Sequence, residues 1–229
     1  MTVAVSSPEM DTVTDSSGVA SVYNFNGSEW KLRGESLLPD TGYSLYALFG
    51  SSLSLSGDGK TLAVGAIKGT LRTNADLQVP TPLEGYAVVY EYSSSSNMWK
   101  SVGEKILGES DGSYTGSAAS LSRDGKKVAV GANFHGIGGH VRVFEYDGDD
   151  LNWVQVGVAI DEESFEPKSR GYYDVLLTTG MGFGSVVSMV DVNGSIRIAI
   201  GAPTTRRQAY YGLDTVVVGE AFIFQEIRS

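Results

Sequence analysis

Residues 49–66 read FGSSLSLSGDGKTLAVGA: an alternating segment, a tight Gly-Asp-Gly turn and an apolar run that ends in Gly-Ala. In the first part, leucines and serines alternate with the two-residue period of a half-buried strand. The turn contains an Asp-Gly pair, which favours a hairpin because both residues tolerate positive φ. The apolar run after it is typical of a buried strand. The stretch therefore predicts a β-hairpin whose second strand is buried.

This pattern returns along the chain, as GSAASLSRDGKKVAVGA at 116–132, FGSVVSMVDVNGSIRIAIGAP at 183–203 and, in shortened form, VAVSSP at 3–8. A strand-like segment led by Gly with alternating aromatics follows every copy, and a segment led by Trp with Gly four residues later follows every copy except the one at 183–203. The Gly-led segments are 18–25, 85–92, 139–146 and 219–224, and the Trp and Gly pairs are Trp30/Gly34, Trp99/Gly103 and Trp153/Gly157. Four short strands joined as a meander and repeated predict the blades of a β-propeller.

We therefore expect an all-β fold of four-stranded antiparallel meanders, with residues 1–229 forming one partial or incomplete β-propeller region. The predicted blades are a partial blade 1 at 1–37, blade 2 at 49–107, blade 3 at 114–160 and a partial blade 4 at 183–227. Two full and two partial blades are fewer than the roughly four to eight blades that close a propeller. Because open blade edges are normally covered, we expect further blades from the same or another chain to pack there. The three tryptophans are expected to pack between blades.

The composition narrows the classes of partner and of chemistry. The formal net charge of −10 argues against nucleic acid, since binding to phosphates needs a basic surface. The chain has no cysteine, which excludes disulfides, thiolate metal sites and cysteine nucleophiles. No apolar run approaches the roughly 20 residues that a membrane-spanning helix needs. We therefore expect neither nucleic-acid binding nor membrane insertion.

The repeated dipeptides are similar to those of a known family. Phe-Gly at 49–50 and 183–184, followed by Gly-Ala at 65–66 and Gly-Ala-Pro at 201–203, resembles the FG-GAP repeat, the blade of integrin-α-type β-propellers. The similarity spans nearly the whole chain, although Thr115 stands in place of Phe in the third unit. The resemblance implies an extracellular or cell-surface platform for interaction with other molecules.

The resemblance also implies a calcium loop of the form Asp-x-Asp-x-Asp-Gly-x-x-Asp between the first two strands of a blade. Asp191 and Asn193 begin this pattern, but the later carboxylates are absent. Ca²⁺ takes six to eight oxygen ligands, more than this turn supplies. We therefore expect no cofactor. Ca²⁺ bound at Asp191 and Asn193 is the alternative, and it would make the chain a calcium-dependent adhesion module.

No arrangement of residues points to catalysis. His135 and His140 flank a glycine-rich turn, where they are predicted to be turn or blade-edge residues and not catalytic bases. No Gly-x-Ser-x-Gly nucleophile elbow is present. The neighbouring Glu162 and Glu163 would point to opposite faces of a strand, so they cannot form a glycosidase pair. We therefore expect that the chain is not an enzyme.

The long connections carry the candidate binding residues. In a meander blade, the second-to-third and fourth-to-first connections emerge on one face, and here they include the long segments 37–48, 67–84, 161–181 and 204–218. Tyr and Arg are enriched at interface hot spots. The residues of this kind, with one Lys, are Tyr43, Tyr46, Lys168, Arg170, Tyr172, Tyr173, Arg206, Arg207, Tyr210 and Tyr211. We predict that they bind a protein partner and that the chain is a non-catalytic interaction scaffold. A carbohydrate-binding propeller is the alternative.

Overall fold

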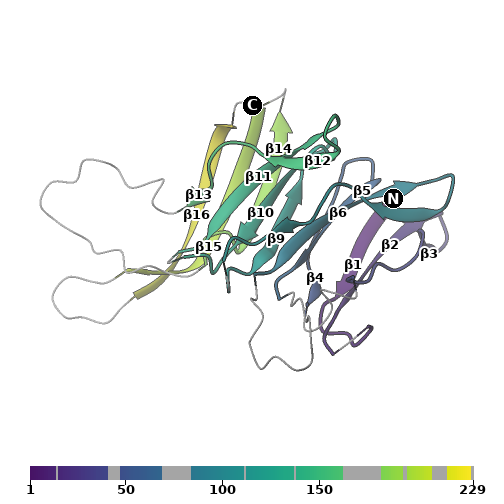
Figure 1. Cartoon of the computed structure of the whole chain (residues 1–229), viewed down its shortest axis with the longest axis horizontal. Coiled ribbons are helices and arrows are strands. Elements are labelled where there is room, and N and C mark those ends of the chain that lie inside the picture. Colours follow the sequence, from purple (N-terminus) through teal and green to yellow (C-terminus); the bar gives the residue numbers. More distant parts are fainter. Residues whose placement is uncertain are drawn as a thin grey trace, which may run out of the picture.

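The fold consists of β-strands that form four antiparallel sheets (Figure 1). The computed structural model describes residues 1–13, 15–40, 47–68, 84–110, 112–136, 138–161, 182–192, 195–207 and 216–227. Sheets A and B contain β1 (Thr2–Ser7), β2 (Val19–Phe25) and β3 (Trp30–Leu32), then β4 (Phe49–Leu55), β5 (Thr61–Ala66), β6 (Tyr86–Ser93), β7 (Met98–Ser101) and β8 (Ile106–Leu107). Sheets C and D contain β9 (Thr115–Leu121), β10 (Lys127–Ala132), β11 (His140–Asp147), β12 (Asn152–Gln155) and β13 (Ile160–Asp161), then β14 (Val186–Val192), β15 (Ser195–Arg207) and β16 (Val216–Ile227).

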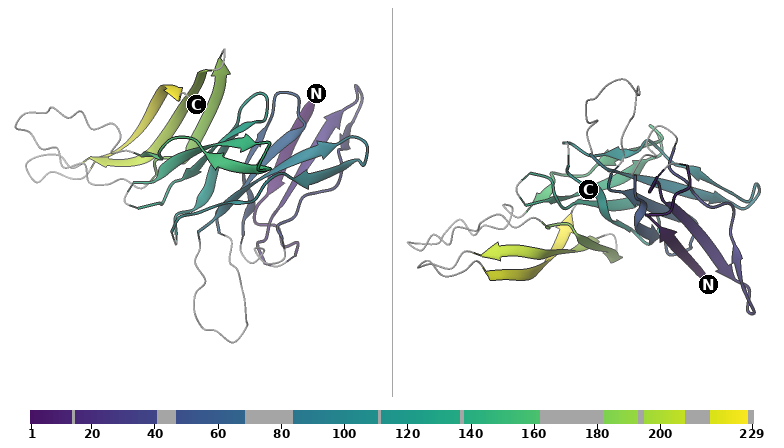
Figure 2. Two further views of the ribbon diagram at one scale, coloured as in Figure 1. Left: turned by 45° about the horizontal axis from the view of Figure 1, so that its top comes forward. Right: turned by 90° about the horizontal axis from the view of Figure 1, so that it is seen from below.

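Each sheet is a meander in which strands that follow one another in the chain pair side by side. In sheets B and C the fourth strand is interrupted, so that β7 and β8 both pair with β6, and β12 and β13 both pair with β11. The sheets follow one another in chain order from one end of the molecule to the other, and the described strands do not close a ring (Figures 1 and 2). The prediction of an all-β, partial propeller is confirmed. Among the described residues, no helix is long and apolar enough to span a membrane.

The core is divided among the junctions between sheets. One buried cluster, which includes Phe49 and Val64, joins sheets A and B, and a second, which includes Val89 and Val128, joins sheets B and C. A third cluster, which includes Ile198, joins sheets C and D. Since each sheet buries its faces against its neighbours, the stability of a sheet depends on the sheets beside it.

The hairpin turns use their aspartates internally. In the β4–β5 turn, Ser56 Oγ donates a hydrogen bond to Asp58 Oδ1 at 2.7 Å, and the N–H of Lys60 donates to the same oxygen at 2.9 Å. These two bonds hold the pKa of Asp58 below its usual value. Ser122 and Asp124 repeat the arrangement in the β9–β10 turn. The two carboxylates therefore organise their turns, as the Asp-Gly chemistry predicts.

Successive sheets are joined by a repeated backbone hydrogen bond. The first residue of the incoming strand, or the residue close before it, donates its N–H to the carbonyl that precedes the Gly-led strand of the previous sheet. The pairs are Phe49 to Ser17 at 3.0 Å, Thr115 to Glu84 at 3.1 Å and Phe183 to Gly138 at 2.9 Å. Because the bond is made by the backbone, Thr115 replaces the phenylalanine of the other two units without loss of this contact.

Glycine is required where the backbones meet. A Cβ atom on Gly65 would lie 2.0 Å from the carbonyl oxygen of Gly116, and one on Gly131 would lie 2.1 Å from that of Gly184. Gly116 and Gly184 also have positive φ, at 91° and 86°. Gly65 and Gly131, each the Gly of a Gly-Ala pair, therefore pack directly against the glycine at or just before the first strand of the next sheet. The two repeated dipeptides are complementary halves of one junction.

Two tryptophans pack at the outer strands of these junctions between sheets. Trp99 Nε1 donates to the carbonyl of Arg33 at 2.8 Å, and Trp153 Nε1 donates to that of Val102 at 2.8 Å. Both indoles are buried, so the prediction of packing between blades is confirmed for them. Trp30 is 44% exposed on the side of sheet A that faces away from sheet B, where no described sheet lies, so for this residue packing between blades stays a prediction.

A glycine substitution tests the junction. We expect Gly65→Ala to lower the free energy of unfolding by roughly 3 kcal/mol, the upper range for overpacking, because the added methyl group meets a backbone carbonyl. Gly148→Ala is the matched control, since a Cβ there meets nothing within 4 Å. Chemical denaturation of both variants measures the difference. Equal stabilities of the two variants would contradict the role of the glycine contact.

Candidate functional site

The structure describes few of the residues that the sequence singles out for binding. Eight of the partner-binding candidates lie outside the described residues: Tyr43, Tyr46, Lys168, Arg170, Tyr172, Tyr173, Tyr210 and Tyr211. Asn193 also lies outside them, and the backbone of Asp191 pairs with Ile196 in the β14–β15 ladder.

Arg206 and Arg207 require a correction. They were expected in a long loop, but their backbones extend β15 and pair with Val217 and Val216 of β16. The pairing shifts register between Ala202 and Thr205 and then resumes, so the strand continues beyond the Gly-Ala-Pro segment. An irregularity that is followed by renewed pairing cannot be distinguished from a strand end by hydrophobic pattern alone.

The second-to-third and fourth-to-first connections meet on one face of the molecule. Their backbones are joined by hydrogen bonds from Lys68 to Ala47 at 3.1 Å, from Phe134 to Ser113 at 3.2 Å and from Gly182 to Asn133 at 3.0 Å. We call the surface formed by the connections that contain these residues the loop face. The short hairpin turns lie at the opposite ends of the strands, where Gly57 donates to the carbonyl of Arg123 at 2.8 Å.

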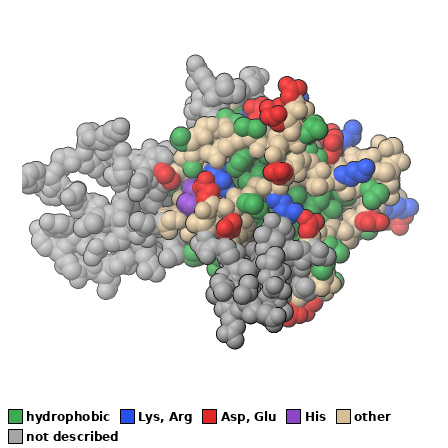
Figure 3. All heavy atoms as spheres, viewed as in Figure 1, with side chains coloured by type: hydrophobic (Ala, Val, Ile, Leu, Met, Phe, Trp, Pro, Cys, Tyr) green, Lys and Arg blue, Asp and Glu red, His purple; other side chains and the backbone are tan. Residues whose placement is uncertain are grey.

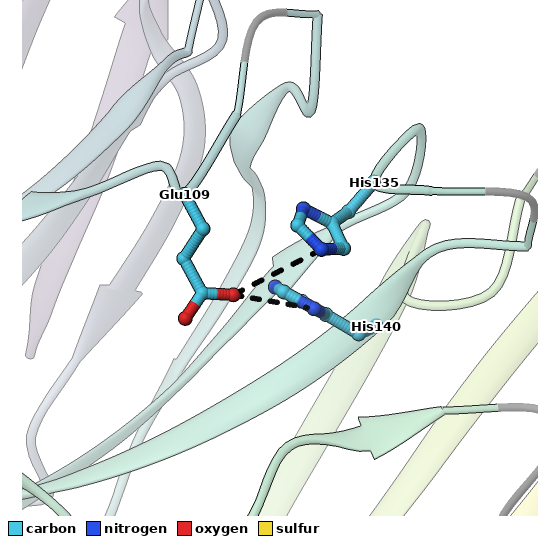
Figure 4. Close-up of side chains that lie close together, drawn as sticks. All are labelled: Glu109, His135 and His140. Carbon is cyan, nitrogen blue, oxygen red and sulfur yellow. Dashed lines mark ion pairs between the residues drawn. The ribbon is translucent and has the colours of Figure 1, made fainter.

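A cluster of titratable side chains lies on the loop face where sheets B and C meet (Figure 4). Glu109 follows β8 of sheet B, His135 lies in the connection between β10 and β11, and His140 is the first residue of β11. Figure 3 shows histidine at the surface beside acidic and basic side chains. The cluster therefore combines residues from two sheets.

A compact turn brings the two histidines together. The N–H of His135 donates to the carbonyl of Ala132 at 3.0 Å, and the N–H of Gly139 donates to that of His135 at 2.8 Å. The imidazole rings of His135 and His140 stack with centroids 4.1 Å apart and planes at 30°. Gly139 has positive φ, and a Cβ there would lie 2.3 Å from the carbonyl oxygen of Phe183. The same sheet junction that needs this glycine therefore positions His140.

The Glu109 carboxylate faces both rings. Its Oε2 atom lies 3.9 Å from His135 Nε2 and 3.8 Å from His140 Nδ1, the two contacts drawn as dashed lines in Figure 4. Its Oε1 atom lies 3.4 Å from Arg142 Nη1, while Arg142 Nη2 donates to the carbonyl of Leu107 at 2.6 Å. One carboxylate oxygen is thus paired with a guanidinium and the other is directed at two imidazoles.

Burial controls the ionisation of this cluster. His140 is only 4% exposed, and this desolvation, with smaller effects of His135 and Arg142, lowers its pKa to about 4. Asp161 of β13 opposes the shift. Burial also lowers the pKa of Arg142, against the attraction of Glu109. At neutral pH, His140 is therefore an uncharged imidazole, which can accept a proton or bind a metal ion.

An aromatic pair lies on the same face. Tyr114, in the connection between β8 and β9, packs against Phe134 with ring centroids 4.8 Å apart, and Phe134 is 42% exposed. Phe134 directly precedes His135, so the pair adjoins the titratable cluster. The interpretation of the sequence missed Glu109, Tyr114 and Phe134. The available signal was the pair of histidines, the only two in the chain, on either side of one glycine-rich turn.

Comparison with known proteins gives structural similarity only. No protein-family model matches the chain, and no curated protein matches it. The periplasmic gluconolactonase PpgL of Pseudomonas aeruginosa has a TM-score of 0.40 at 17% identity, over 82% of this chain and 45% of that protein. Sqt1 of Saccharomyces cerevisiae has a TM-score of 0.40 at 11% identity, over 82% and 38%. The Trypanosoma rangeli sialidase bound to the inhibitor DANA has a TM-score of 0.39 at 16% identity, over 83% and 30%.

This chain therefore spans less than half the length of each of these proteins. The prediction that the chain is not an enzyme is contradicted by these neighbours, because two of them, the gluconolactonase and the sialidase, are enzymes. At such low identities, neither an activity nor a partner carries over from them to this chain.

The buried histidine predicts a pH dependence of stability. The unfolded chain protonates His140 near its ordinary pKa of 6.5, whereas the folded chain does so only near about 4. The folded state therefore binds fewer protons between these values, and the free energy of unfolding falls as the pH falls from 6.5 to 4. Denaturation over this pH range should show a smaller fall for His140→Gln than for the unchanged chain. His135→Gln is the control and should retain most of the fall. Identical pH profiles for all three proteins would contradict this assignment.

Proposed function

We propose that this chain is an interaction module, a segment of an FG-GAP-like β-propeller that binds a partner protein through the loop face. The family resemblance has support in the junctions, because Gly131 of a Gly-Ala pair packs on Gly184 of a Phe-Gly pair, and Gly65 packs on Gly116 at the equivalent position after Thr115. Because these repeated residues hold neighbouring sheets together, we assign them to the scaffold and not to binding. Binding is then left to the connections, which differ from unit to unit.

The aromatic pair of the exposed Phe134 and the half-buried Tyr114 carries this proposal. Phe134 directly precedes His135, whose ring faces Glu109, and aromatic side chains are enriched at protein interfaces. The predicted tyrosines and basic residues, such as Arg170 and Tyr172, lie outside the described residues and stay predictions from the sequence. The described part of the loop face therefore offers an aromatic side chain close to charged groups.

Substitutions on the two faces test partner binding. We expect proteins captured by the immobilised chain to include one whose affinity falls at least about tenfold with Phe134→Ala, because a hot-spot truncation costs more than about 1.4 kcal/mol. Leu151→Ala is the matched control, an exposed apolar side chain in the β11–β12 turn on the opposite face. Titration with the purified partner measures both affinities. Equal affinities of the two variants would contradict binding through the loop face.

A glycan array separates this proposal from carbohydrate binding, since aromatic side chains also stack on sugar rings. Selective sugar binding that is abolished by Tyr172→Ala and Tyr210→Ala would replace the protein-partner proposal with a lectin-like one. Absence of sugar binding, together with the loss of partner affinity in Phe134→Ala, is the result expected for a protein-interaction module.

We also propose that a further blade packs on sheet D. One row of residues across each sheet repeats the same chemistry: Ser54, Ala63 and Val89 in sheet B, Ser120, Ala129 and Val143 in sheet C, and Ser188, Ala199 and Ile223 in sheet D. In the first two rows the serine hydroxyl accepts a hydrogen bond from the next sheet, from the N–H of Leu121 or of Met189, each at 2.9 Å. In sheet D no neighbouring sheet among the described residues covers this row, and Ile223 is 77% exposed.

The state of association in solution tests this second proposal. In a solution of this chain alone, the blade that can cover sheet D belongs to another copy, whose sheet A exposes Trp30 and Val5. We expect concentration-dependent association in sedimentation velocity, weakened by Ile223→Lys because a charged side chain is costly to bury. Leu151→Lys, in an exposed turn, should leave association unchanged. A monomer at all concentrations would contradict the proposal.

A further inference from the structure

We propose that Glu109, His135 and His140 form a binding site for a divalent transition-metal ion of the zinc class. This inference goes beyond the proposed interaction function and does not depend on the identity of any partner. The ligand atoms of the three side chains all lie within 4.8 Å of one another, although the residues come from two different sheets. The chain supplies two nitrogens and one oxygen, which is the ligand set of many open zinc sites.

The distances require only a small contraction. In a tetrahedral site with bonds of about 2.1 Å, neighbouring ligand atoms lie roughly 3.4 Å apart. Here Glu109 Oε2 lies 3.8 Å from His140 Nδ1 and 3.9 Å from His135 Nε2. His135, in the turn, and Glu109, after β8, are the more exposed of the three side chains and can make this adjustment. The two rings, which stack with centroids 4.1 Å apart, must also turn and separate so that both nitrogens point at one ion.

The hydrogen bond of His135 suits metal binding. Its Nδ1 atom lies 3.2 Å from the hydroxyl of Ser110, while Nε2 faces Glu109. When Nδ1 carries the proton and donates to Ser110, the lone pair of Nε2 is directed into the cluster. Metal-binding histidines are commonly oriented in this way by a partner at the other ring nitrogen.

A second observation, independent of the cluster geometry, points to a ligand. His140 is only 4% exposed and thus 96% buried, and its Nε2 atom has no hydrogen-bond partner. Its Nδ1 atom lies 3.8 Å from Glu109, which is beyond hydrogen-bonding distance. Buried polar side chains almost always have a partner. A metal ion bound at Nδ1 would give this buried ring a polar contact through that atom, while Nε2 would still have none.

Arg142 limits the kinds of metal ion that the site can bind. Its guanidinium pairs with Oε1 of Glu109 and is anchored on the carbonyl of Leu107, so Oε2 remains directed at the imidazoles. The positive charge weakens the attraction for any cation, and the two imidazoles restore it only for metals that bind nitrogen well. Mg²⁺ and Ca²⁺ prefer oxygen ligands, so we expect the site to discriminate against them.

The test uses the full chain without a histidine tag. We expect Zn²⁺ to bind with one equivalent in competition with a chromophoric chelator, and excess Mg²⁺ or Ca²⁺ not to displace it. Glu109→Gln and His135→Gln should each weaken Zn²⁺ binding by at least about tenfold, the lower range even for outer-shell partners. Glu104→Gln, a nearby exposed carboxylate that is not part of the cluster, should bind like the unchanged chain. Circular dichroism confirms that each variant is folded.

Nuclear magnetic resonance gives a direct readout, because the chain has only two histidines and one substitution assigns both rings. On addition of Zn²⁺, the ¹⁵N shifts of one nitrogen in each ring should move to metal-bound values. Zn²⁺ binding that persists in Glu109→Gln and His135→Gln, or unchanged imidazole shifts, would overturn the proposal and assign the ion to surface carboxylates. Partner binding through Phe134 is measured in the presence of a chelator, so its outcome does not depend on whether the chain binds a metal ion.

Discussion

The close approach of the Gly65 and Gly116 backbones is the contact on which the architecture depends. A carbonyl that occupies the space of a Cβ atom can be accommodated only by glycine, and the same contact recurs between Gly131 and Gly184. It sets the distance between neighbouring sheets. Three other features depend on that distance between sheets. They are the buried clusters, the backbone hydrogen bond at the start of each new sheet, and the tryptophans at the outer strands.

This stacking also determines where function can lie. Where a neighbour is present, the central strands of each described sheet are mostly buried, so their faces contribute little free surface apart from sheet D and the far side of sheet A. What remains is the two ends of the strands. The hairpin ends are short and use their aspartates internally, whereas the other end gathers the longer connections and the Glu109 cluster.

The junction explains why a titratable cluster forms at all. Glu109 and the two histidines belong to different sheets, and only the spacing between sheets B and C brings the carboxylate to the imidazoles. His140 is buried because β11 is a central strand of sheet C, and its ionisation follows from that burial. The scaffold therefore changes the chemistry of a residue that, in an isolated hairpin, would be an ordinary exposed histidine.

The sequence by itself determined the strands, the hairpins and their repetition, because alternating leucines, Asp-Gly turns and paired dipeptides are local patterns with local causes. It also predicted the packing of Trp99 and Trp153, since a repeated indole in a repeated unit has a repeated environment. Only the tertiary structure decided that Trp30 is exposed, that Arg206 extends a strand and that Glu109 lies beside His135 and His140. These outcomes depend on which sheet lies next to which, a relation between distant segments that no local pattern encodes.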